Sequence, residues 1–273
     1  MQSIQKNIKN SNLLLEVNNL NVFFDTADGK IQAVKDVNLF INKGECLGIV
    51  GESGSGKTQT FFSITGLLSS NGYCNGSAIF KDFDLISASE DKKREYLGKS
   101  IGFIFQDPMT SLTPHMKIGE QLSEIAIFHD NLSKSEALKR ALNVLDIVKL
   151  PKSRNLINSY PHELSGGMKQ RIMIAISLMC SPELIIADEP TTALDVTTQS
   201  EILNIFNDLQ KGMGISIVLI SHNIGVIAET SDRVMVMKGG KVVEKGSTFD
   251  VLTSPKDEYT KHLLSCIPPW LEG

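Results

Sequence analysis

The sequence has little of what marks a membrane-spanning, secreted or nucleic-acid-binding protein. Its best apolar run, residues 172–180, is nine residues long, whereas a membrane-spanning helix needs about 20. Near the N-terminus, Glu16 interrupts a short run of leucines, so no signal peptide is predicted. The net charge of −4 lacks the basic excess of nucleic-acid-binding proteins. We therefore expect a chain that stays in the cytosol, crosses no membrane and binds no nucleic acid.

Cysteines are few and scattered, and no two of them form a Cys-x-x-Cys pair. They are Cys46, Cys74, Cys180 and Cys266. This spacing predicts reduced thiols, with neither a zinc site nor a disulfide framework. The chain has 273 residues, of which 41% are hydrophobic and 21% charged, so it can bury a core without such cross-links.

Short apolar runs alternate with stretches of helical spacing along most of the chain. The runs are residues 46–50, 101–105, 184–187, 215–220 and 234–237. Such runs are typical of strands buried on both faces, and their alternation with helices predicts an α/β fold with a mostly parallel sheet. Residues 14–24 and 37–41 instead alternate apolar with polar side chains, which predicts antiparallel strands with one wet face. Residues 108–160 show helical patterns alone and are interpreted as an inserted helical unit.

The clearest chemical signal is a glycine-rich loop between a predicted strand and a predicted helix. It consists of Gly51, Glu52, Ser53, Gly54, Ser55, Gly56, Lys57 and Thr58. Backbone N–H groups of such a loop surround a phosphate, while the lysine supplies positive charge and the threonine a hydroxyl for Mg²⁺. A flexible glycine turn is the alternative, which the strand–loop–helix context disfavours.

Two carboxylates, Asp188 and Glu189, follow the apolar run 184–187. Ligands of open α/β sheets bind at this end of the strands. Asp188 is predicted to hold Mg²⁺ through its water shell, and Glu189 to orient the water that attacks the γ-phosphate. The alternative is that both acids merely begin the next helix, where they complement its dipole.

Three further features are weaker when each is taken alone. Gln106 and His222 each follow an apolar run and are expected to reach the γ-phosphate region, although a lone histidine is more often structural. Ser165, Gly166 and Gly167 begin another helical run and form a second candidate anion site, or simply a helix cap. This second loop cannot serve the phosphates of the first unless the chain folds back or a second copy supplies it.

In this order, the motifs resemble those of the ATP-binding subunit of an ABC transporter. They correspond to the Walker A motif (51–58), Q-loop (Gln106), signature (164–168), Walker B motif (184–189), D-loop (193–195) and H-loop (His222). The resemblance implies an α/β P-loop NTPase (RecA-like) core with an antiparallel β subdomain and an inserted helical subdomain. The implied boundaries are 1–106 for the β subdomain and first part of the core, 107–160 for the helical subdomain, 161–250 for the signature helix and rest of the core, and 251–273 for a C-terminal tail.

The resemblance also assigns the ligands, ATP and Mg²⁺. It implies that Phe24, with Phe23 as second choice, stacks on adenine, that Thr60 joins the nucleotide contacts, and that Gln106 joins Thr58 and Asp188 at Mg²⁺. It implies hydrolysis by Glu189 with His222 and Gln106. The signature loop of a second, identical or related ATPase subunit would then close on this nucleotide, together with Asp195.

Within that family the loops and residues 255–264 resemble the oligopeptide, dipeptide and nickel importer branch, which usually has Asn where this chain has Thr113 and His-Pro at Asp257–Glu258. The branch implies two membrane-spanning permease subunits, an extracytoplasmic solute-binding protein, and a peripheral position at the cytoplasmic face of the cell (inner) membrane. No iron–sulfur cluster is expected, because the chain stops soon after Cys266. The rival functions are an ABC-type ATPase outside transport and a P-loop kinase; the first usually has further modules, and the second lacks a signature loop.

Overall fold

A computed structural model of the chain describes residues 12–150, 153–192 and 194–265. Its larger sheet has the strand order β10-β9-β3-β8-β7-β6. The strands are β3 (Cys46–Val50), β6 (Ile101–Ile104), β7 (Leu184–Asp188), β8 (Ser216–Ser221), β9 (Arg233–Lys238) and β10 (Lys241–Ser247). All neighbours pair in parallel except β9 and β10. The five apolar runs are thus confirmed as strands, with shifts of one residue at some ends, whereas β10 was not predicted.

The strands of this sheet are apolar on both faces because both faces are covered. Along β7, Leu184 and Ile186 belong to one buried cluster, together with Phe61 of the helix that follows the phosphate loop. The intervening Ile185 and Ala187 belong to a second cluster with the helices of the opposite face. Successive side chains of a strand point to opposite faces, so an uninterrupted apolar run results.

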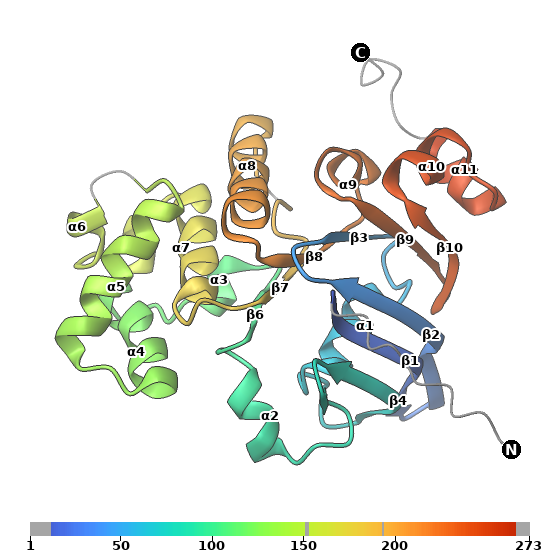
Figure 1. Cartoon of the computed structure of the whole chain (residues 1–273), viewed down its shortest axis with the longest axis horizontal. Coiled ribbons are helices and arrows are strands. Elements are labelled where there is room, and N and C mark those ends of the chain that lie inside the picture. Colours follow the sequence, from blue (N-terminus) through green and yellow to red (C-terminus); the bar gives the residue numbers. More distant parts are fainter. Residues whose placement is uncertain (1–11, 151–152, 193, 266–273) are drawn as a thin grey trace, which may run out of the picture.

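A second sheet, of order β2-β1-β4-β5, packs beside α1 and the larger sheet (Figure 1). Its strands are β1 (Leu13–Thr26), β2 (Gly29–Asn42), β4 (Gly72–Phe80) and β5 (Phe83–Asp84), and all pair antiparallel. The segments predicted to alternate form parts of β1 and β2, which pair as a hairpin. The hairpin is longer than predicted, and β4 was not predicted. In the first halves of β2 and β4, exposed residues such as Lys30 and Asn75 obscure the apolar alternation.

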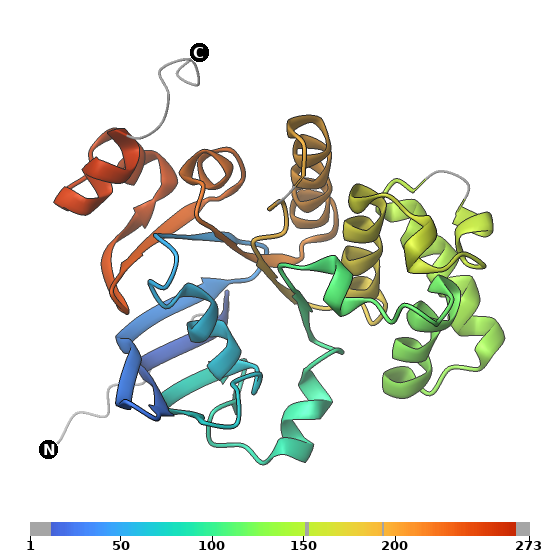
Figure 2. The same cartoon turned by 180° about the vertical axis from the view of Figure 1, so that it is seen from behind.

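The helices fall into two groups. Those around the sheet are α1 (Lys57–Ile64), α2 (Glu90–Tyr96), α7 (Gly166–Leu178), α8 (Val196–Met213), α9 (Ile224–Thr230), α10 (Thr248–Thr253) and α11 (Glu258–Ser265). Between β6 and α7 come α3 (Pro108–Ser111), α4 (Ile118–Asp130), α5 (Lys134–Ile147), α6 (Ser153–Leu156) and a short 3₁₀ turn (Pro161–Glu163). In both views α4, α5 and α6 lie to one side, away from the smaller sheet (Figure 1 and Figure 2).

The C-terminal region differs from the sequence-based expectation. The segment from residue 251 onward, expected to be a tail, contains the end of α10 and the further helix α11. In the described part of the chain, no helix has the length and apolar character needed to cross a bilayer. The subdomain boundaries at 106, 160 and 250 stay predictions.

Candidate functional site

The loop of residues 51–58 connects the end of β3 to the start of α1, and two of its glycines have no room for a side chain. A Cβ on Gly51 would lie 2.1 Å from the carbonyl oxygen of Met237, and one on Gly56 would lie 2.6 Å from that of Ala33. Gly56 also has φ +98° as the residue preceding α1. Only glycine meets both requirements, so the backbone path of this loop depends on its composition.

Lys57 lies inside this loop and is only 5% exposed. Its Nζ donates hydrogen bonds to the carbonyl oxygens of Gly51 at 2.7 Å and Glu52 at 2.9 Å. Burial lowers the pKa of Lys57, while the carboxylates of Glu189 and Asp188 act in the opposite direction. The ammonium group is therefore enclosed by loop backbone, where a phosphate would compete with the two carbonyls for it.

Thr58 and Asp188 meet across the edge of the sheet. The Thr58 Oγ1 donates to the Asp188 Oδ1 at 3.0 Å. Asp188 is 4% exposed, and its burial raises the pKa of the carboxyl to about 6. A hydroxyl and a carboxylate side by side are oxygen donors of the kind that Mg²⁺ prefers. These residues therefore fit a magnesium site beside the loop.

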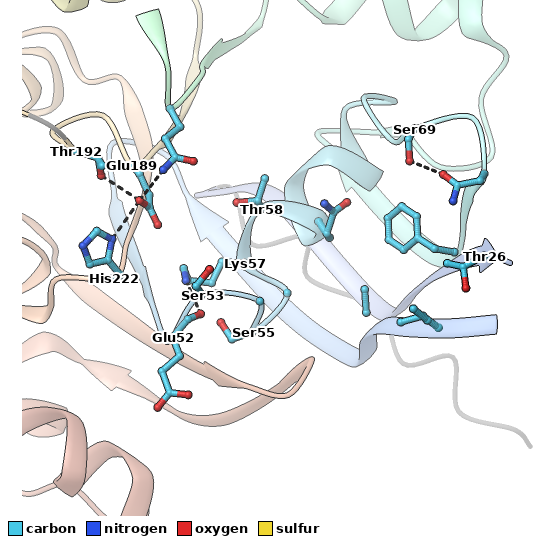
Figure 3. A pocket seen from close by; sticks show the side chains of 18 of the residues that line it. Thr26, Glu52, Ser53, Ser55, Lys57, Thr58, Ser69, Glu189, Thr192 and His222 are labelled. Carbon is cyan, nitrogen blue, oxygen red and sulfur yellow. Dashed lines mark hydrogen bonds and ion pairs between the residues drawn. The ribbon is translucent and has the colours of Figure 1, made fainter. Parts of the chain in front are cut away.

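Glu189 is the point at which side chains from three strand ends converge. Its Oε2 accepts hydrogen bonds from Gln106 Nε2 at 3.1 Å and Thr192 Oγ1 at 3.0 Å, and His222 Nδ1 lies 3.1 Å away (Figure 3). Gln106 follows β6 and His222 follows β8, the two neighbours of β7 in the sheet. Glu189 itself has φ +46°, a conformation that non-glycine residues rarely adopt outside constrained sites.

These groups surround one open cavity of about 1120 Å³. Its predicted lining residues are Phe24, Glu52, Ser53, Gly54, Ser55, Gly56, Lys57, Thr58, Gln106, Glu189 and His222. The lining residues that sequence reasoning missed are Thr26, Ile31, Ala33, Gln59, Ser69, Asn71, Thr192 and Leu263. The cavity thus has an aromatic end at the smaller sheet, and a charged end at the loop and Glu189 (Figure 3).

The structure separates the two candidate aromatic residues. Phe24 lines the cavity. Phe23 points elsewhere: its ring stacks on Tyr73 at 5.4 Å between centroids, and the Lys30 Nζ lies 4.2 Å from its centroid. Successive residues of β1 face opposite sides, which explains the difference. Phe24 is therefore the better placed of the two for a flat aromatic ligand.

Thr60 lies differently from the expectation that it touches the nucleotide. Its side chain is fully buried, and its hydroxyl donates to the carbonyl oxygen of Gly56 at 2.9 Å. A threonine hydroxyl in a helix commonly bonds the carbonyl four residues earlier. The side chain therefore supports the loop from within α1, whereas its neighbour Gln59 lines the cavity.

The second glycine-rich loop lies elsewhere. Ser165 caps α7 by accepting from the backbone N–H of Met168 at 3.3 Å, and Asp195 caps α8 by accepting from the N–H of Thr198 at 3.0 Å. The hydrogen bonds that the backbone N–H and the side chain of Thr198 make to Asp195 lower the pKa of this carboxyl. Gly166 and Gly167 belong to the same region. Ser165, Gly166, Gly167 and Asp195 are all described by the structure, and none of them lines the cavity. Ala193 of the predicted D-loop is outside the described residues.

Known proteins share both the sequence and the fold. A model of the family described as ABC transporter matches residues 34–192, more than half of the chain. An oligopeptide transport ATP-binding protein, OppD, from Salmonella typhimurium is 48% identical over 258 residues, which is 94% of this chain and 77% of the relative. A dipeptide transport ATP-binding protein, DppD, from Bacillus subtilis is 46% identical over 257 residues, 93% of this chain and 77% of the relative.

Solved structures give the same result for the fold. An ATP-binding cassette, solved as a dimer in a post-hydrolysis state bound to ADP and Pi, has a TM-score of 0.77 and 30% identity. The match covers 86% of this chain and 99% of that one. The cbiO1 protein from Clostridium perfringens, part of an ABC transporter complex, has a TM-score of 0.75 and 31% identity, covering 96% and 98% of the two chains.

Proposed function

This chain belongs to the ABC transporter family, and we propose that it is the ATP-hydrolysing subunit of an importer of oligopeptides or dipeptides. The observation that carries the hydrolytic role is the convergence of Gln106, Thr192 and His222 on one oxygen of Glu189, beside the phosphate loop. A carboxylate held in this way at the end of a parallel strand is placed to accept a proton from a water at the γ-phosphate.

The two ends of the cavity bind different parts of the nucleotide. Phe24 stacks on the adenine, while Lys57 and the loop N–H groups bind the phosphates. Thr58, Asp188 and Gln106 are the side chains that would hold Mg²⁺. The charge of the ion would neutralise phosphate oxygens while the γ-phosphoryl group is transferred to water. Glu189 takes the proton of the attacking water, and His222 and Gln106 keep its carboxylate oriented toward that position.

Completion of the site requires a second subunit, identical or related. Ser165, Gly166, Gly167 and Asp195 lie outside the cavity of their own chain, yet their loop exposes backbone N–H groups at the start of a helix. We assign them to the nucleotide of the facing subunit, so that ATP is bound between two copies. The similar cassette that was solved as a dimer with ADP and Pi supports this arrangement.

The remaining partners follow from the family. We propose that two membrane-spanning permease subunits hold the ATPase pair at the cytoplasmic face of the cell membrane, and that an extracytoplasmic binding protein delivers the solute. The names of the relatives, oligopeptide and dipeptide transport proteins, favour a peptide over nickel as that solute. Nucleic acid has no part in this function.

The test has two arms. Purified chain with MgATP should release ADP and inorganic phosphate in equal amounts; ADP formed with phosphate transfer to another acceptor would instead indicate a kinase. The complex isolated from membranes through this chain should contain permease subunits and, in vesicles with its binding protein, should hydrolyse ATP faster on addition of peptide. Stimulation by Ni²⁺ and not by peptides would replace the proposed solute, and copurification without membrane subunits would contradict a transport role.

A further inference from the structure

The phosphate loop has one hydrogen-bond partner that comes from the far end of the chain. The backbone N–H of Glu52 donates to the hydroxyl oxygen of Tyr259 at 3.0 Å. Tyr259 is the second residue of α11 and is only 7% exposed, although helix α11 as a whole is short and mostly polar. Tyr259 belongs to a buried apolar cluster against which Leu263 and Leu264 of the same helix also pack, so packing holds the ring while its hydroxyl reaches the loop.

The segment before Tyr259 is fixed to the sheet by a set of local bonds. The Glu244 carboxylate, on β10, accepts from the N–H groups of Lys256 at 2.8 Å and Asp257 at 3.1 Å. Asp257 in turn accepts from the N–H of Tyr259 at 2.9 Å. The Lys238 Nζ lies 4.4 Å from the centroid of the tyrosine ring, in a cation–π contact. The backbone that carries Tyr259 is therefore fixed to β10, and the cation–π contact adds a constraint on the ring whose hydroxyl meets the loop.

The other bonds of Glu52 lie within the loop itself. Its carbonyl oxygen accepts from the Lys57 Nζ at 2.9 Å and from the N–H of Ser55 at 3.2 Å. A bound phosphate competes for the Lys57 ammonium and so weakens the first of these bonds. Tyr259 is not among the residues that line the cavity, and the group that it binds is a backbone N–H and not the Lys57 ammonium that a phosphate attracts. This bond can hold the first turn of the loop in both the empty and the occupied state.

We propose that Tyr259 is a positioning residue for the nucleotide: by accepting the hydrogen bond of the Glu52 N–H, it keeps the first turn of the phosphate loop in the shape that receives the phosphates. The proposal rests on the proposed function of the loop as an ATP site. A second residue of the same helix, Leu263, lines the cavity. Helix α11 therefore borders the nucleotide site, and loss of the acceptor for the Glu52 N–H would loosen the loop.

The test compares Tyr259→Phe with Tyr96→Phe in the full chain. Both changes remove one hydroxyl and keep the ring; Tyr96 ends α2, and its ring stacks on Phe83 at 4.4 Å. We expect Tyr259→Phe to raise the Kd for ADP by about three- to tenfold by calorimetry, the range that one lost hydrogen bond produces. KM for ATP should rise similarly, while kcat at saturation stays within about twofold, because the groups around Glu189 are untouched. Tyr96→Phe should leave both constants unchanged.

Hydrogen exchange supplies the readout that a merely structural role would not move. In the nucleotide-free chain the Glu52 amide should be protected, and Tyr259→Phe should speed its exchange about tenfold or more while the amides of β3 keep their rates. An unchanged Kd for ADP together with unchanged exchange at Glu52 would overturn the proposal.

Two further measurements separate this proposal from other causes of failure. If Tyr259→Phe does not fold, rapid exchange of the Glu52 amide in the unmutated chain overturns the proposal, and protection supports it. Lys238→Met, which removes the cation over the ring, should then raise the Kd for ADP by about two- to threefold. Failure of the unmutated chain to bind ADP or ATP would contradict the proposed function. Normal binding by the unmutated chain, with no effect of either variant, would contradict the role of Tyr259 and leave the proposed function intact.

Discussion

The chain contains two glycine-rich loops that each lead into a helix, and they use their polar groups in opposite ways. The loop before α1 contains Lys57, lies beside Asp188 and Glu189, and opens on a cavity of about 1120 Å³. At the loop before α7, the hydroxyl of Ser165 instead caps its own helix. That loop borders a depression of about 540 Å³ whose other lining residues include Arg171 and Glu201, which pair with each other.

This difference teaches that the two loops are not equivalent anion sites. The first lies beside polar and charged groups from the ends of three neighbouring strands, so we expect a single copy of the chain to bind a nucleotide. The charged residues beside the second loop include Arg171 and Glu201, which pair with each other. In the proposed function, this second loop acts on phosphates that a facing subunit brings to it. Substitutions in each loop can test whether the first loop binds nucleotide within its own chain and the second depends on a facing subunit.

The largest effect is expected for Glu189→Gln, which acts on the complete site. The amide keeps the size of the side chain but cannot accept a proton from the attacking water. We expect hydrolysis to fall by about 100- to 10,000-fold, while ATP binding is preserved and the ATP-bound dimer accumulates. Phosphate release and size-exclusion chromatography with light scattering measure the two consequences.

Glu183→Gln is the matched control, because Glu183 precedes the other end of β7 and its side chain is 43% exposed in a pair with Lys81. Hydrolysis by this variant should be normal. Near-normal hydrolysis by Glu189→Gln would remove Glu189 from the role of general base, and with it the argument that the first loop is the catalytic one.

Ser165→Arg addresses the dependent loop. A bulky side chain at this loop prevents the close approach of the facing subunit, and a misplacement of about 1 Å suffices to reduce catalysis roughly 100-fold. We therefore expect hydrolysis to fall by about 100-fold while ADP binding to the monomer stays unchanged. Steady-state assays and calorimetry on the same preparation test both halves of this prediction.

Loss of the helix cap must be separated from loss of the interface. Ser133 caps α5 in the same manner, accepting from the N–H of Glu136 at 3.3 Å, as Ser165 accepts from Met168. Ser133→Arg should lose a similar stability, about 1 kcal/mol, yet hydrolyse ATP normally. Weakened ADP binding to monomeric Ser165→Arg would show that the loop acts on the nucleotide of its own chain and not on that of a facing subunit.

The catalytic end of the cavity could be predicted from the sequence because it obeys a local rule. Gln106, Glu189 and His222 each follow an apolar run, and parallel strands bring such residues to one edge of the sheet. The same reasoning found the parallel strands, because fully buried strands are continuous apolar runs. Thr192 lies only three residues beyond Glu189 but has no pattern that distinguishes it from other threonines near a helix start.

The rest of the site depends on contacts between distant segments. Ser69 and Asn71 precede β4, a strand that was not predicted because exposed residues interrupt its apolar pattern. Leu263 lies in α11, a segment that was expected to be a tail. Tyr259 and Glu52 are 207 residues apart, and nothing in either sequence neighbourhood indicates their hydrogen bond. Thr60 shows the converse: its place beside the phosphate motif suggested a ligand contact, but a threonine in a first helical turn can bond back to the loop.

Asp188→Asn tests a cost that the complete site imposes on folding. Burial raises the pKa of this carboxyl from its ordinary 3.8 to about 6, so keeping it ionised at neutral pH opposes folding by up to about 3 kcal/mol. Because the folded-state pKa lies above the unfolded one, this destabilisation is complete above about pH 6 and disappears as the pH falls to 4. We expect Asn to stabilise the nucleotide-free chain by about 1–3 kcal/mol at pH 7.5, and by much less at pH 4.5.

Urea denaturation in EDTA at both pH values measures this gain. Asp91→Asn is the control, because the Asp91 side chain is 95% exposed and should show no change. Hydrolysis by Asp188→Asn should fall despite its greater stability. Equal stability of Asp188→Asn and the unmutated chain at pH 7.5 would mean that the buried carboxylate is fully compensated by Lys57 and Thr58.

The smallest effect is expected for a pair of glycine-to-alanine changes that ask how tightly the dependent loop is fixed to its own chain. A Cβ on Gly167 would lie 2.6 Å from the Cγ2 of Thr198, whose hydroxyl and N–H both bond Asp195. Thr198 cannot move without loss of that cap, so Gly167→Ala should destabilise by about 1 kcal/mol. Gly212, within α8, has nothing within 4 Å of its Cβ position, and Gly212→Ala should stabilise by about 0.5–1 kcal/mol. If the two variants change the free energy of unfolding in opposite directions, as measured by urea denaturation, the contact between α7 and α8 is rigid, and the signature loop and Asp195 would approach a facing nucleotide as one body. Equal gains in stability would mean that this contact yields and that the two loops move independently.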